Sequence, residues 1–458
     1  MIVFFSYTQT SSLIPESIIY PMFNEGFIDK FLRTVKKIIP TPIFNFLAPV
    51  YHLLLSMLGA LAYGFPSRSL KIIGVTGTKG KSTTVYMITR ILENAGEKVA
   101  AIGSLGYKIL DKEWPNTLKM TMPGRTRLQK FLWQAKKAGA EFVVLEVTSE
   151  GLAQHRLAGV AVDGAVFTNL HREHLESHGG FDNYLRAKQK LFEKTKHIHI
   201  LNHDDPYFEK FSDFPASIKI TYGQHGLINP ARYHLNLKLL GDFNIYNALA
   251  ALSVADTYRL DMNKAVQTLN SIDSIPGRME VIEAEFKGLK FKVIIDYAHT
   301  PDSLEAVYGT FKEAKGTEHG TGSQEQRVVN SNPRALSPKL ICVLGAAGGG
   351  RDKWKRPEFG RIAGQYCDEI ILTNEDPYDE DPEEILNQVE KGIGDKFKSL
   401  KVSRILDRGE AIKVALTDAS ANDIVVITGK GSETSIAVGG GRNVSWSDRQ
   451  AVLNILRG

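Results

Sequence analysis

Residues 74–84 read Gly-Val-Thr-Gly-Thr-Lys-Gly-Lys-Ser-Thr-Thr, and this stretch decides the fold. An apolar run at residues 70–73 precedes it, and a helical pattern at residues 85–92 follows it. A glycine turn between a strand and a helix presents backbone N–H groups and a helix N-terminus to phosphate groups. Val75 occupies the first glycine position of the usual phosphate-loop pattern, but the core of the loop is intact. We therefore predict a site for ATP whose phosphates meet Gly77, Thr78, Lys79, Gly80, Lys81, Ser82 and Thr83.

The composition is that of a globular protein with room for two or three domains. Of the 458 residues, 43% are hydrophobic and 23% charged, which is enough apolar content for a sizeable core. The net charge of +5 is small and gives no reason to expect a nucleic-acid partner. Cys342 and Cys367 lie in apolar surroundings, so we expect two buried thiols. Two cysteines exclude a four-cysteine zinc site and suit a reducing cytoplasm.

Residues 42–65 form an uncharged apolar stretch that follows four basic residues between positions 30 and 37. A membrane-spanning helix needs about 20 apolar residues, and Asn45, Pro49 and His52 interrupt this one. A span would also leave the basic flank outside, against the usual charge bias, if the ATP site is cytosolic. We therefore favour a helix that lies on the membrane surface or packs on the protein over a true span.

Beyond residue 66, short apolar runs alternate with helical patterns, which predicts parallel α/β sheets. One series of strands is expected at residues 70–75, 142–147, 165–170 and 197–201, and a second at 291–296, 340–344, 369–372 and 424–428. We predict a short apolar segment (1–66), a central P-loop ATPase domain (67–275) and a C-terminal Rossmann-like α/β domain (276–458). Residues 315–338 are polar and read as a disordered insertion.

Three further segments carry chemistry. Glu146 ends the second expected strand, at the sheet edge where ligands of open α/β folds bind. A polar run with three histidines, including His174, follows the third strand, and Lys188 lies on an amphipathic helix after it. Each signal alone is also typical of a solvated turn or helix face, so only their combination with the phosphate loop favours a catalytic site.

In their order, these segments resemble the Mur ligase family over residues 70–458, most closely its UDP-N-acetylmuramoyl-tripeptide synthetase branch (MurE). The resemblance implies that Lys81, Glu146, His174 and Lys188 are catalytic, that Lys188 is carbamylated, and that Ser82, Glu146, His174 and Lys188 hold Mg²⁺. It also implies an adenine-side role for Asn244 and Asn247, a phosphate contact for Arg278 and a ribose contact for Asp296.

The same resemblance implies the substrate contacts. Residues 146–156 and the Thr-Met-Pro segment at 121–123 place Thr121, Thr148, Gln154 and Arg156 on a UDP-sugar peptide, although Thr-Thr-Pro is more usual there. The amino-acid pocket would comprise Arg351, Asp376, Gly429 and Glu433. Tyr378 stands where members that add meso-diaminopimelate have an arginine for the distal carboxylate, which favours L-lysine or another diamino acid.

One departure from the family lies upstream, because only 66 residues precede the first strand where members carry a uridine-binding domain. We expect an ATP- and Mg²⁺-dependent amide ligase that adds an amino acid to UDP-N-acetylmuramoyl-L-alanyl-D-glutamate through an acylphosphate. The alternatives are a folylpolyglutamate synthase-like or poly-γ-glutamate synthetase-like acceptor, and a non-catalytic scaffold that binds ATP. We expect a cytoplasmic monomer, with peripheral membrane contact through residues 42–65.

Overall fold

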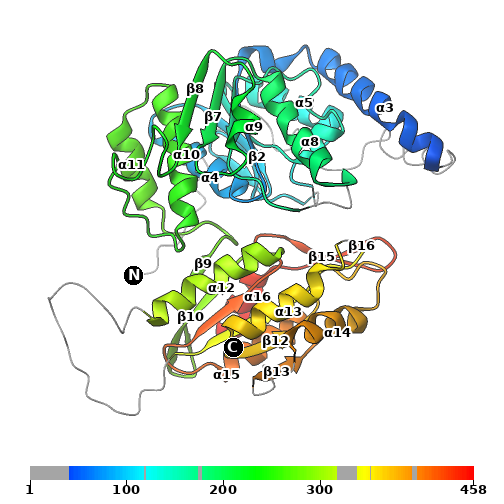
Figure 1. The fold of residues 1–458 in the computed structure, drawn as a ribbon, viewed down its shortest axis with the longest axis vertical. Helices are drawn as coiled ribbons and strands as arrows, with labels where there is room; N and C mark the ends of the chain where they lie inside the picture. The colour runs from blue at the N-terminus through cyan, green and yellow to red at the C-terminus, as the bar shows by residue number, and fades with distance from the viewer. Residues whose placement is uncertain are drawn as a thin grey trace.

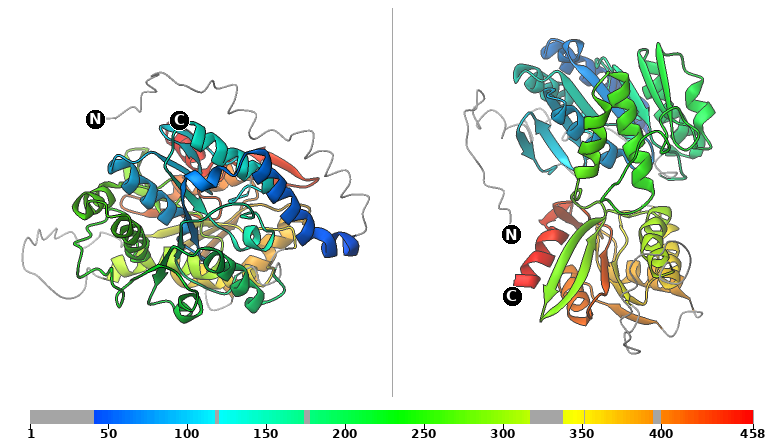
Figure 2. Two further views of the ribbon diagram at one scale, coloured as in Figure 1. Left: turned by 90° about the horizontal axis from the view of Figure 1, so that it is seen from above. Right: turned by 90° about the vertical axis from the view of Figure 1, so that its left-hand side faces the viewer.

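The computed structural model describes residues 41–117, 120–173, 178–316, 338–350, 352–394 and 400–457. The predicted site residues His174 and Arg351, and nearly all of the insertion predicted at 315–338, lie outside these ranges. The described chain forms two lobes, each with a central sheet covered by helices on both faces (Figures 1 and 2). This arrangement confirms the predicted α/β class.

The upper lobe of Figure 1 contains a sheet with the strand order β4-β3-β2-β5-β1-β6-β7-β8. Pairing is parallel from β2 to β8, and β3 and β4 extend the edge as antiparallel strands. The bounds of the strands are β1 Lys71–Thr76, β2 Val99–Gly103, β3 Gly106–Ile109, β4 Lys112–Trp114, β5 Phe142–Glu146, β6 Gly164–Phe167, β7 Ile198–Asn202 and β8 Ile218–Tyr222. The helices are α3 Thr41–Ala62, α4 Lys81–Asn94, α5 Arg125–Lys137, α6 Ser149–Ala153, α8 Phe181–Lys194, α9 Phe208–Ser212, α10 Phe243–Thr257 and α11 Met262–Ser271.

The lower lobe contains a sheet with the order β13-β12-β11-β14-β10-β9, in which only the β9–β10 pairing is antiparallel among the described strands. Its strands are β9 Glu280–Phe286, β10 Leu289–Ile295, β11 Leu340–Leu344, β12 Glu369–Leu372, β13 Lys401–Arg404 and β14 Ile424–Ile427, and β15 Ser435–Val438 pairs with β16 Arg442–Ser445. The helices are α12 Pro301–Gly316, α13 Lys355–Tyr366, α14 Pro382–Ile393, α15 Arg408–Asp418 and α16 Asp448–Arg457.

Strand β1 shows why the short apolar runs of the sequence form the central strands of the sheets. Successive side chains of a strand point to opposite faces, and both faces of β1 are covered. Ile73 and Val75 pack with α4, α10 and α11, whereas Ile72 packs with α5 and α8 on the other side. A central parallel strand therefore reads as a continuous apolar run, and all eight predicted strands are present with each end within three residues of its prediction.

The chain crosses from one lobe to the other in three residues. Ile275 is buried in the core of the upper lobe, and Met279 is buried in the core of the lower one. Gly277, between them, has a φ of 62°, and a Cβ there would lie 2.1 Å from the backbone nitrogen of Ser432. The crossing therefore packs directly against the loop that follows β14. The domain division at residues 275 and 276 stays a prediction.

The cysteine prediction was wrong. Cys342 of β11 and Cys367, which follows α13, form a disulfide, with Cα atoms 6.1 Å apart. Both side chains face the same core of the lower lobe, between the sheet and helices α12, α13 and α14. Because 25 residues separate them in the sequence, no local pattern indicated that the fold brings them together.

Helix α3 covers most of the uncharged stretch and packs on α5, which is one of the two arrangements expected for this segment, and contact with a membrane surface stays a prediction. Within the described residues, no helix is both long enough and apolar enough to cross a membrane.

Candidate active site

The phosphate loop at residues 77–80 joins β1 to α4 and needs glycine at two positions. Gly77 has a φ of 153° and Gly80 a φ of 78°, a conformation that side chains other than glycine's rarely adopt. A Cβ on Gly77 would lie 1.9 Å from Thr168 Oγ1, and one on Gly80 would lie 2.3 Å from Asn247 Oδ1. The loop is therefore pressed against both the segment after β6 and helix α10.

The segment after β6 holds the loop in place through polar contacts. The Thr78 N–H donates to the Asn169 carbonyl and the Lys79 N–H to Asn169 Oδ1, each at 2.8 Å. In return, the His171 N–H donates to Thr78 Oγ1 at 2.9 Å, and Thr168 Oγ1 donates to the Lys79 carbonyl at 2.7 Å. The described start of the predicted polar run, at residues 168–171, thus lies at the site, and Asn169 is a site residue that sequence reasoning missed.

Two lysines, the buried Lys188 and the half-buried Lys81, converge on one carbonyl of the loop. Lys188 Nζ donates to the Gly77 carbonyl at 2.6 Å, and Lys81 Nζ donates to the same oxygen at 3.1 Å and to the Thr78 carbonyl at 2.8 Å. Burial lowers the pKa of Lys81, while the Glu146 charge opposes that shift. Burial and the neighbouring Lys81 charge together hold the pKa of Lys188 well below its usual value. The neutral amine, which is the nucleophilic form of a lysine, is therefore more accessible at Lys188 than at an exposed lysine.

Glu146 ends β5 beside the loop, because Glu146 pairs in register with Val75 of β1. Its carboxylate accepts from Ser82 Oγ at 3.1 Å and from the Ser104 N–H at 2.7 Å. Ser104 Oγ lies 2.9 Å from Thr121 Oγ1, so one serine connects the carboxylate to the predicted substrate segment. Ser104 was missed, although its position directly after β2, at the same sheet edge, is the signal that could have indicated it.

Arg278 reaches Ser82 from the crossing between the lobes. Its Nη2 donates to Ser82 Oγ at 3.2 Å, and its guanidinium lies 4.3 Å from the centre of the Tyr297 ring. Among the described residues, the buried Nε of Arg278 has no hydrogen-bond partner. A half-buried guanidinium beside the phosphate loop is suited to contact phosphate oxygens.

Asp296, which the resemblance places on the ribose, already accepts two backbone hydrogen bonds. The Met279 and Ala298 N–H groups each donate to its carboxylate at 2.7 Å. Burial raises the pKa of Asp296, and these bonds and the Arg278 charge oppose the shift. The carboxylate therefore fixes the end of β10 to the crossing, whether or not it also contacts a nucleotide.

On the predicted adenine side, Asn247 of α10 packs against Gly80, and Thr84 Oγ1 donates to Asn247 Oδ1 at 3.3 Å. Asn247 Nδ2 donates to Asn244 Oδ1 at 3.1 Å, and Asn244 Nδ2 donates to the Leu240 carbonyl at 2.7 Å. The structure thus brings both asparagines to the phosphate loop as one hydrogen-bonded unit.

The predicted acceptor residues lie on α6 and the turn after it. Thr148 Oγ1 accepts from the Gly151 N–H at 3.1 Å and so caps α6. Gln154 Oε1 accepts from Arg156 Nη2 at 2.8 Å, and Arg156 Nη1 also donates to the Met122 carbonyl. The Thr-Met-Pro segment and the Gln154–Arg156 pair therefore form one connected surface.

The predicted amino-acid residues gather where β14 ends. Lys430 Nζ donates to Asp376 Oδ1 at 3.0 Å and to Glu433, whose other oxygen accepts from Tyr297 Oη at 3.1 Å. Gly429 has a φ of 103°, and a Cβ there would lie 2.4 Å from Glu375 Oε2. Burial raises the pKa of Glu375 to about 7, with the Lys430 charge opposing and the Asp376 charge adding to the shift.

Glu173 is a further residue that sequence reasoning missed. Its side chain is buried, and Oε1 lies 3.5 Å from His299 Nε2 and 4.0 Å from Lys355 Nζ, both in the lower lobe. Lys79 and Asp302 form a second ion pair across the lobes at 3.5 Å. The phosphate-loop side of the site is thus closed by contacts from the other lobe.

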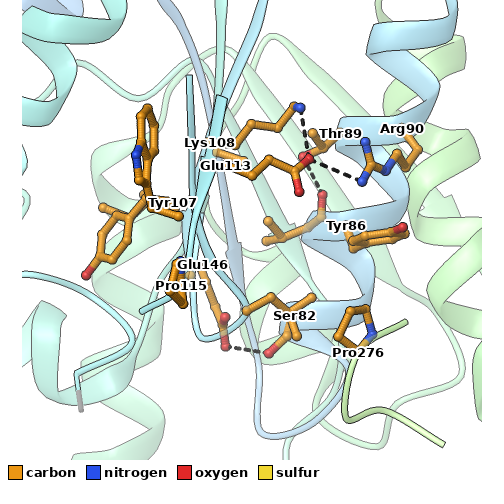
Figure 3. Close-up of a pocket in the computed structure, with 17 residues that line it drawn as sticks. Ser82, Tyr86, Thr89, Arg90, Tyr107, Lys108, Glu113, Pro115, Glu146 and Pro276 are labelled. Atoms are coloured by element: carbon orange, nitrogen blue, oxygen red, sulfur yellow. Dashed lines mark hydrogen bonds and ion pairs between the residues drawn. The ribbon is translucent and has the colours of Figure 1, made fainter. Parts of the chain in front are cut away.

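A cavity of about 310 Å³ opens between α4 and the β2–β4 strands (Figure 3). Ser82, Glu146 and Pro276 line one end of it, and Arg90, Lys108 and Glu113 form an ion-paired cluster at the other. Within the described ranges, no three His, Cys, Asp or Glu side chains cluster as a ready-made metal site. The Ser82 hydroxyl and the Glu146 carboxylate nonetheless supply the hard oxygen donors that Mg²⁺ prefers.

Comparison with known proteins gives two family matches. The Mur ligase middle domain matches residues 75–255, and the Mur ligase glutamate ligase domain matches residues 326–431. The chain is 35% identical over 434 residues to the UDP-N-acetylmuramoyl-L-alanyl-D-glutamate–2,6-diaminopimelate ligase of Syntrophomonas wolfei subsp. wolfei, covering 88% of this chain and 82% of that protein.

It is also 35% identical over 441 residues to the UDP-N-acetylmuramyl-tripeptide synthetase of Roseiflexus sp., covering 88% of this chain and 81% of that protein. Among solved structures, a UDP-N-acetylmuramoyl-L-alanyl-D-glutamate–2,6-diaminopimelate ligase superposes with a TM-score of 0.55 and 30% identity, covering 88% of this chain and 83% of that one.

Proposed function

The chain belongs to the Mur ligase family and is an ATP-dependent ligase of peptidoglycan synthesis, and from this premise we propose its substrates. We propose that it adds L-lysine or another diamino acid to UDP-N-acetylmuramoyl-L-alanyl-D-glutamate through an acylphosphate. The acceptor is inferred from the names of the relatives: one names UDP-N-acetylmuramoyl-L-alanyl-D-glutamate itself, and the other names a UDP-N-acetylmuramyl tripeptide as its product. The choice of amino acid is inferred from the pocket of this chain.

The proposal rests on one observation, which is that four polar or charged side chains converge at the start of α4. Lys81 and Ser82 of α4, Glu146 of β5 and Arg278 of the crossing come from three separate segments and meet within hydrogen-bond distance of one another or of the phosphate loop. Lys188 lies against the same loop. A phosphoryl-transfer site needs cations and oxygen donors around one point, because catalysis rests on positioning and charge stabilisation.

Magnesium fits the donor set of this site. Ser82 and Glu146 would hold one ion, and a carbamylated Lys188 with His174 would hold a second, as the family resemblance implies. When bound, the ions neutralise negative charge on the phosphates and the acceptor carboxylate. The low pKa of Lys188 supports carbamylation, because only the neutral amine attacks carbon dioxide.

The protein's own groups then account for the steps. The acceptor carboxylate attacks the γ-phosphorus of ATP in line, while Lys81 and Arg278 stabilise the charge on the phosphoryl oxygens. ADP leaves, and the amino group of the incoming amino acid attacks the acylphosphate carbonyl, giving an amide and phosphate. The interlobe contacts of Glu173 and Lys79 limit access of water to the acylphosphate.

The charges in the amino-acid pocket support a cationic side chain on the incoming amino acid. Glu375, Asp376 and Glu433 gather around the single ammonium of Lys430. Arg408 lies nearby, but Asp448 neutralises it in a paired contact at 2.7 and 2.8 Å. Among the described residues of the pocket, carboxylates outnumber cations, which favours a terminal ammonium group, as in lysine, over the second carboxylate of diaminopimelate. Tyr378 likewise offers no cation for a second carboxylate.

The experiment is phosphate release by the purified full chain with Mg-ATP, the UDP-linked dipeptide and L-lysine, L-ornithine or meso-diaminopimelate. Mass spectrometry of the product identifies the amide, and Lys81→Ala serves as the matched inactive control. In this proposal the reaction occurs in the cytoplasm, at the inner face of the membrane where residues 42–65 contact lipid, and a monomer suffices.

Lysine- or ornithine-dependent release with a tripeptide product supports the proposal. Release with diaminopimelate alone overturns the amino-acid assignment but leaves the ligase intact. ATP binding without release for any amino acid overturns the acceptor, and pteroyl-glutamate and poly-γ-glutamate acceptors are then the substrates to assay.

A further inference from the structure

Helix α3 packs on the protein through its smaller and more polar side. His52, Ser56, Gly59 and Ala60 are buried, and they recur at the spacing of one helix face. A Cβ on Gly59 would lie 3.0 Å from the Thr126 backbone, so the two helices approach closely here. Small residues permit such close contact between helices.

The opposite side of α3, over its described side chains from residue 50 onward, carries six large apolar residues that are exposed, whereas Leu55 is half-buried. They recur every three or four residues, and between 40% and 66% of each is accessible: Val50, Leu53, Leu54, Met57, Leu58 and Leu61. A helix on the surface of a globular protein usually turns its apolar stripe inward. An outward stripe of six large residues marks a surface that binds something apolar.

Basic residues without acidic ones border this stripe. Helix α3 has no charged residue, whereas the adjoining α5 has five arginines and lysines and no aspartate or glutamate. Lys136 and Lys137 are exposed at the end of α5, and Arg68 is exposed just beyond α3. Within the described residues, none of these three side chains pairs with a carboxylate.

Aromatic rings lie at the junction between the apolar stripe and the basic residues. The rings of Tyr63 and Trp133 are 5.9 Å apart, and Lys137 Nζ lies 4.6 Å from the centre of the Trp133 ring. The Arg68 guanidinium lies 4.6 Å from the centre of the Phe65 ring. Tryptophan and tyrosine, backed by lysine and arginine, are the residues that favour the boundary between lipid headgroups and acyl chains.

We propose that the α3–α5 surface, defined as the exposed stripe of α3 together with the basic side chains of α5 and Arg68, binds the surface of an anionic phospholipid membrane. Helix α3 lies parallel to the bilayer, with its leucines at the acyl boundary and the basic residues on the headgroup phosphates. In Figure 1 this helix runs along the outer edge of the upper lobe, clear of the lower one.

The charge pattern favours lipid over a second copy of the chain. In a two-fold symmetric dimer this surface would meet itself, so the basic residues of α5 would face one another. Anionic headgroups instead offer the opposite charge next to an apolar layer. The inference uses only α3, α5 and Arg68 and does not depend on the proposed substrates.

The test is co-sedimentation of the full chain with vesicles of phosphatidylglycerol and phosphatidylcholine in equal parts, and with phosphatidylcholine alone. Leu54→Ser/Leu58→Ser/Leu61→Ser should weaken binding to the anionic vesicles at least ~10-fold, because each leucine contributes buried apolar area. Lys136→Gln/Lys137→Gln should weaken binding to the anionic vesicles at least ~10-fold and change little on neutral ones.

Val444→Ser/Leu289→Ser is the matched control, because these apolar residues are equally exposed but lie in the lower lobe. It should bind vesicles like the parent chain, and all variants should keep the parent's thermal midpoint and ATPase activity. The proposal is overturned if the triple serine variant sediments with anionic vesicles like the parent. It is also overturned if the parent ignores vesicles and the triple variant converts a dimer to a monomer in analytical ultracentrifugation.

Discussion

Lys188 Nζ lies 2.6 Å from the carbonyl oxygen of Gly77, a residue 111 positions earlier in the chain. Helix α8 therefore delivers a buried amine to the backbone of the phosphate loop. An ammonium in this place would be costly, because Lys81 points to the same carbonyl. The geometry explains why one lysine of α8 is buried while its neighbour on the helix, Lys190, is only half-buried.

We predict that Lys188→Ala lowers kcat at least ~10²-fold, since a group positioned at the reacting phosphate is lost. Lys190→Ala, two positions further along α8, should leave kcat within about twofold. Short carboxylates such as acetate or propionate should restore part of the activity of Lys188→Ala, and none of that of Lys81→Ala. Steady-state rates decide this, and full activity of Lys188→Ala without added carboxylate would refute a carbamate role.

Lys81→Ala should reduce phosphate release ~10²–10³-fold, because one cation that stabilises the transferring phosphoryl group is removed. Its fold should persist, since the Lys81 amine bonds only to carbonyls of its own loop. The comparison is kcat against the dissociation constant of a fluorescent ATP analogue. Near-normal ligation by this variant would remove the phosphate loop from the mechanism.

Gly103→Ala should impair catalysis although residue 103 touches no predicted ligand. A Cβ there would lie 2.6 Å from Glu146 Oε2 and 3.0 Å from Glu146 Cβ, so the carboxylate would have to move away from Ser82. Gly124→Ala is the control, because a Cβ at that position meets nothing within 4 Å. We expect kcat of Gly103→Ala to fall ~10-fold or more, and an unchanged Mg²⁺ dependence would contradict this explanation.

Glu375 should give the protein a measurable pH dependence of stability. Its pKa is raised from 4.5 to about 7 in the folded state, so the folded chain holds a proton that the unfolded chain releases between these values. The free energy of unfolding should therefore fall as the pH rises from about 5 to about 7, by up to about 3 kcal/mol for this group.

Glu375→Gln removes that slope. The free energy of unfolding of Glu375→Gln minus that of the parent should therefore be larger at pH ~8 than at pH ~5. Urea unfolding at both pH values measures the difference, and Glu410→Gln, at an exposed helix position, is the control. If the parent and Glu375→Gln lose equal stability over this window, the carboxyl group titrates near its ordinary pKa.

Tyr378→Arg should shift the amino-acid preference toward diaminopimelate. The backbone of Tyr378 is fixed by its N–H donating to the Ala437 carbonyl at 3.2 Å, and its ring lies against Gly349. An arginine on this backbone would add a forked donor for a second carboxylate beside the acidic cluster. We expect the ratio of kcat/KM for diaminopimelate over lysine to rise ~10-fold or more, and a falling ratio would place the side-chain subsite elsewhere.

The sequence indicated the parts of the site that depend on local pattern. The glycines and Lys81 of the phosphate loop follow from a strand, a turn and a helix in succession, and Glu146 follows from the end of a buried strand. Ser104 could not be found in the same way. It meets Glu146 only because β2 lies beside β5 in the sheet, and strand order is a property of the whole fold.

The remaining misses have the same physical origin. Asn169 supports the loop through contacts 90 positions away, and Glu173 meets residues of the other lobe. The disulfide between Cys342 and Cys367 depends on how α13 packs on β11. For α3, the sequence indicated an apolar helix, but its apolar residues surround it, so only packing on α5 decides which of them stay exposed.

The close packing of Gly277 on the loop at Ser432 connects the predicted amino-acid pocket to the phosphate loop. That loop carries Lys430 and Glu433 of the amino-acid pocket, and the next residue after Gly277 is Arg278, whose guanidinium contacts Ser82. A swing of the lower lobe cannot move the pocket without moving this guanidinium. In the proposed reaction, the loop that would bind the incoming amino acid and the guanidinium that would contact phosphate are therefore joined directly through Gly277.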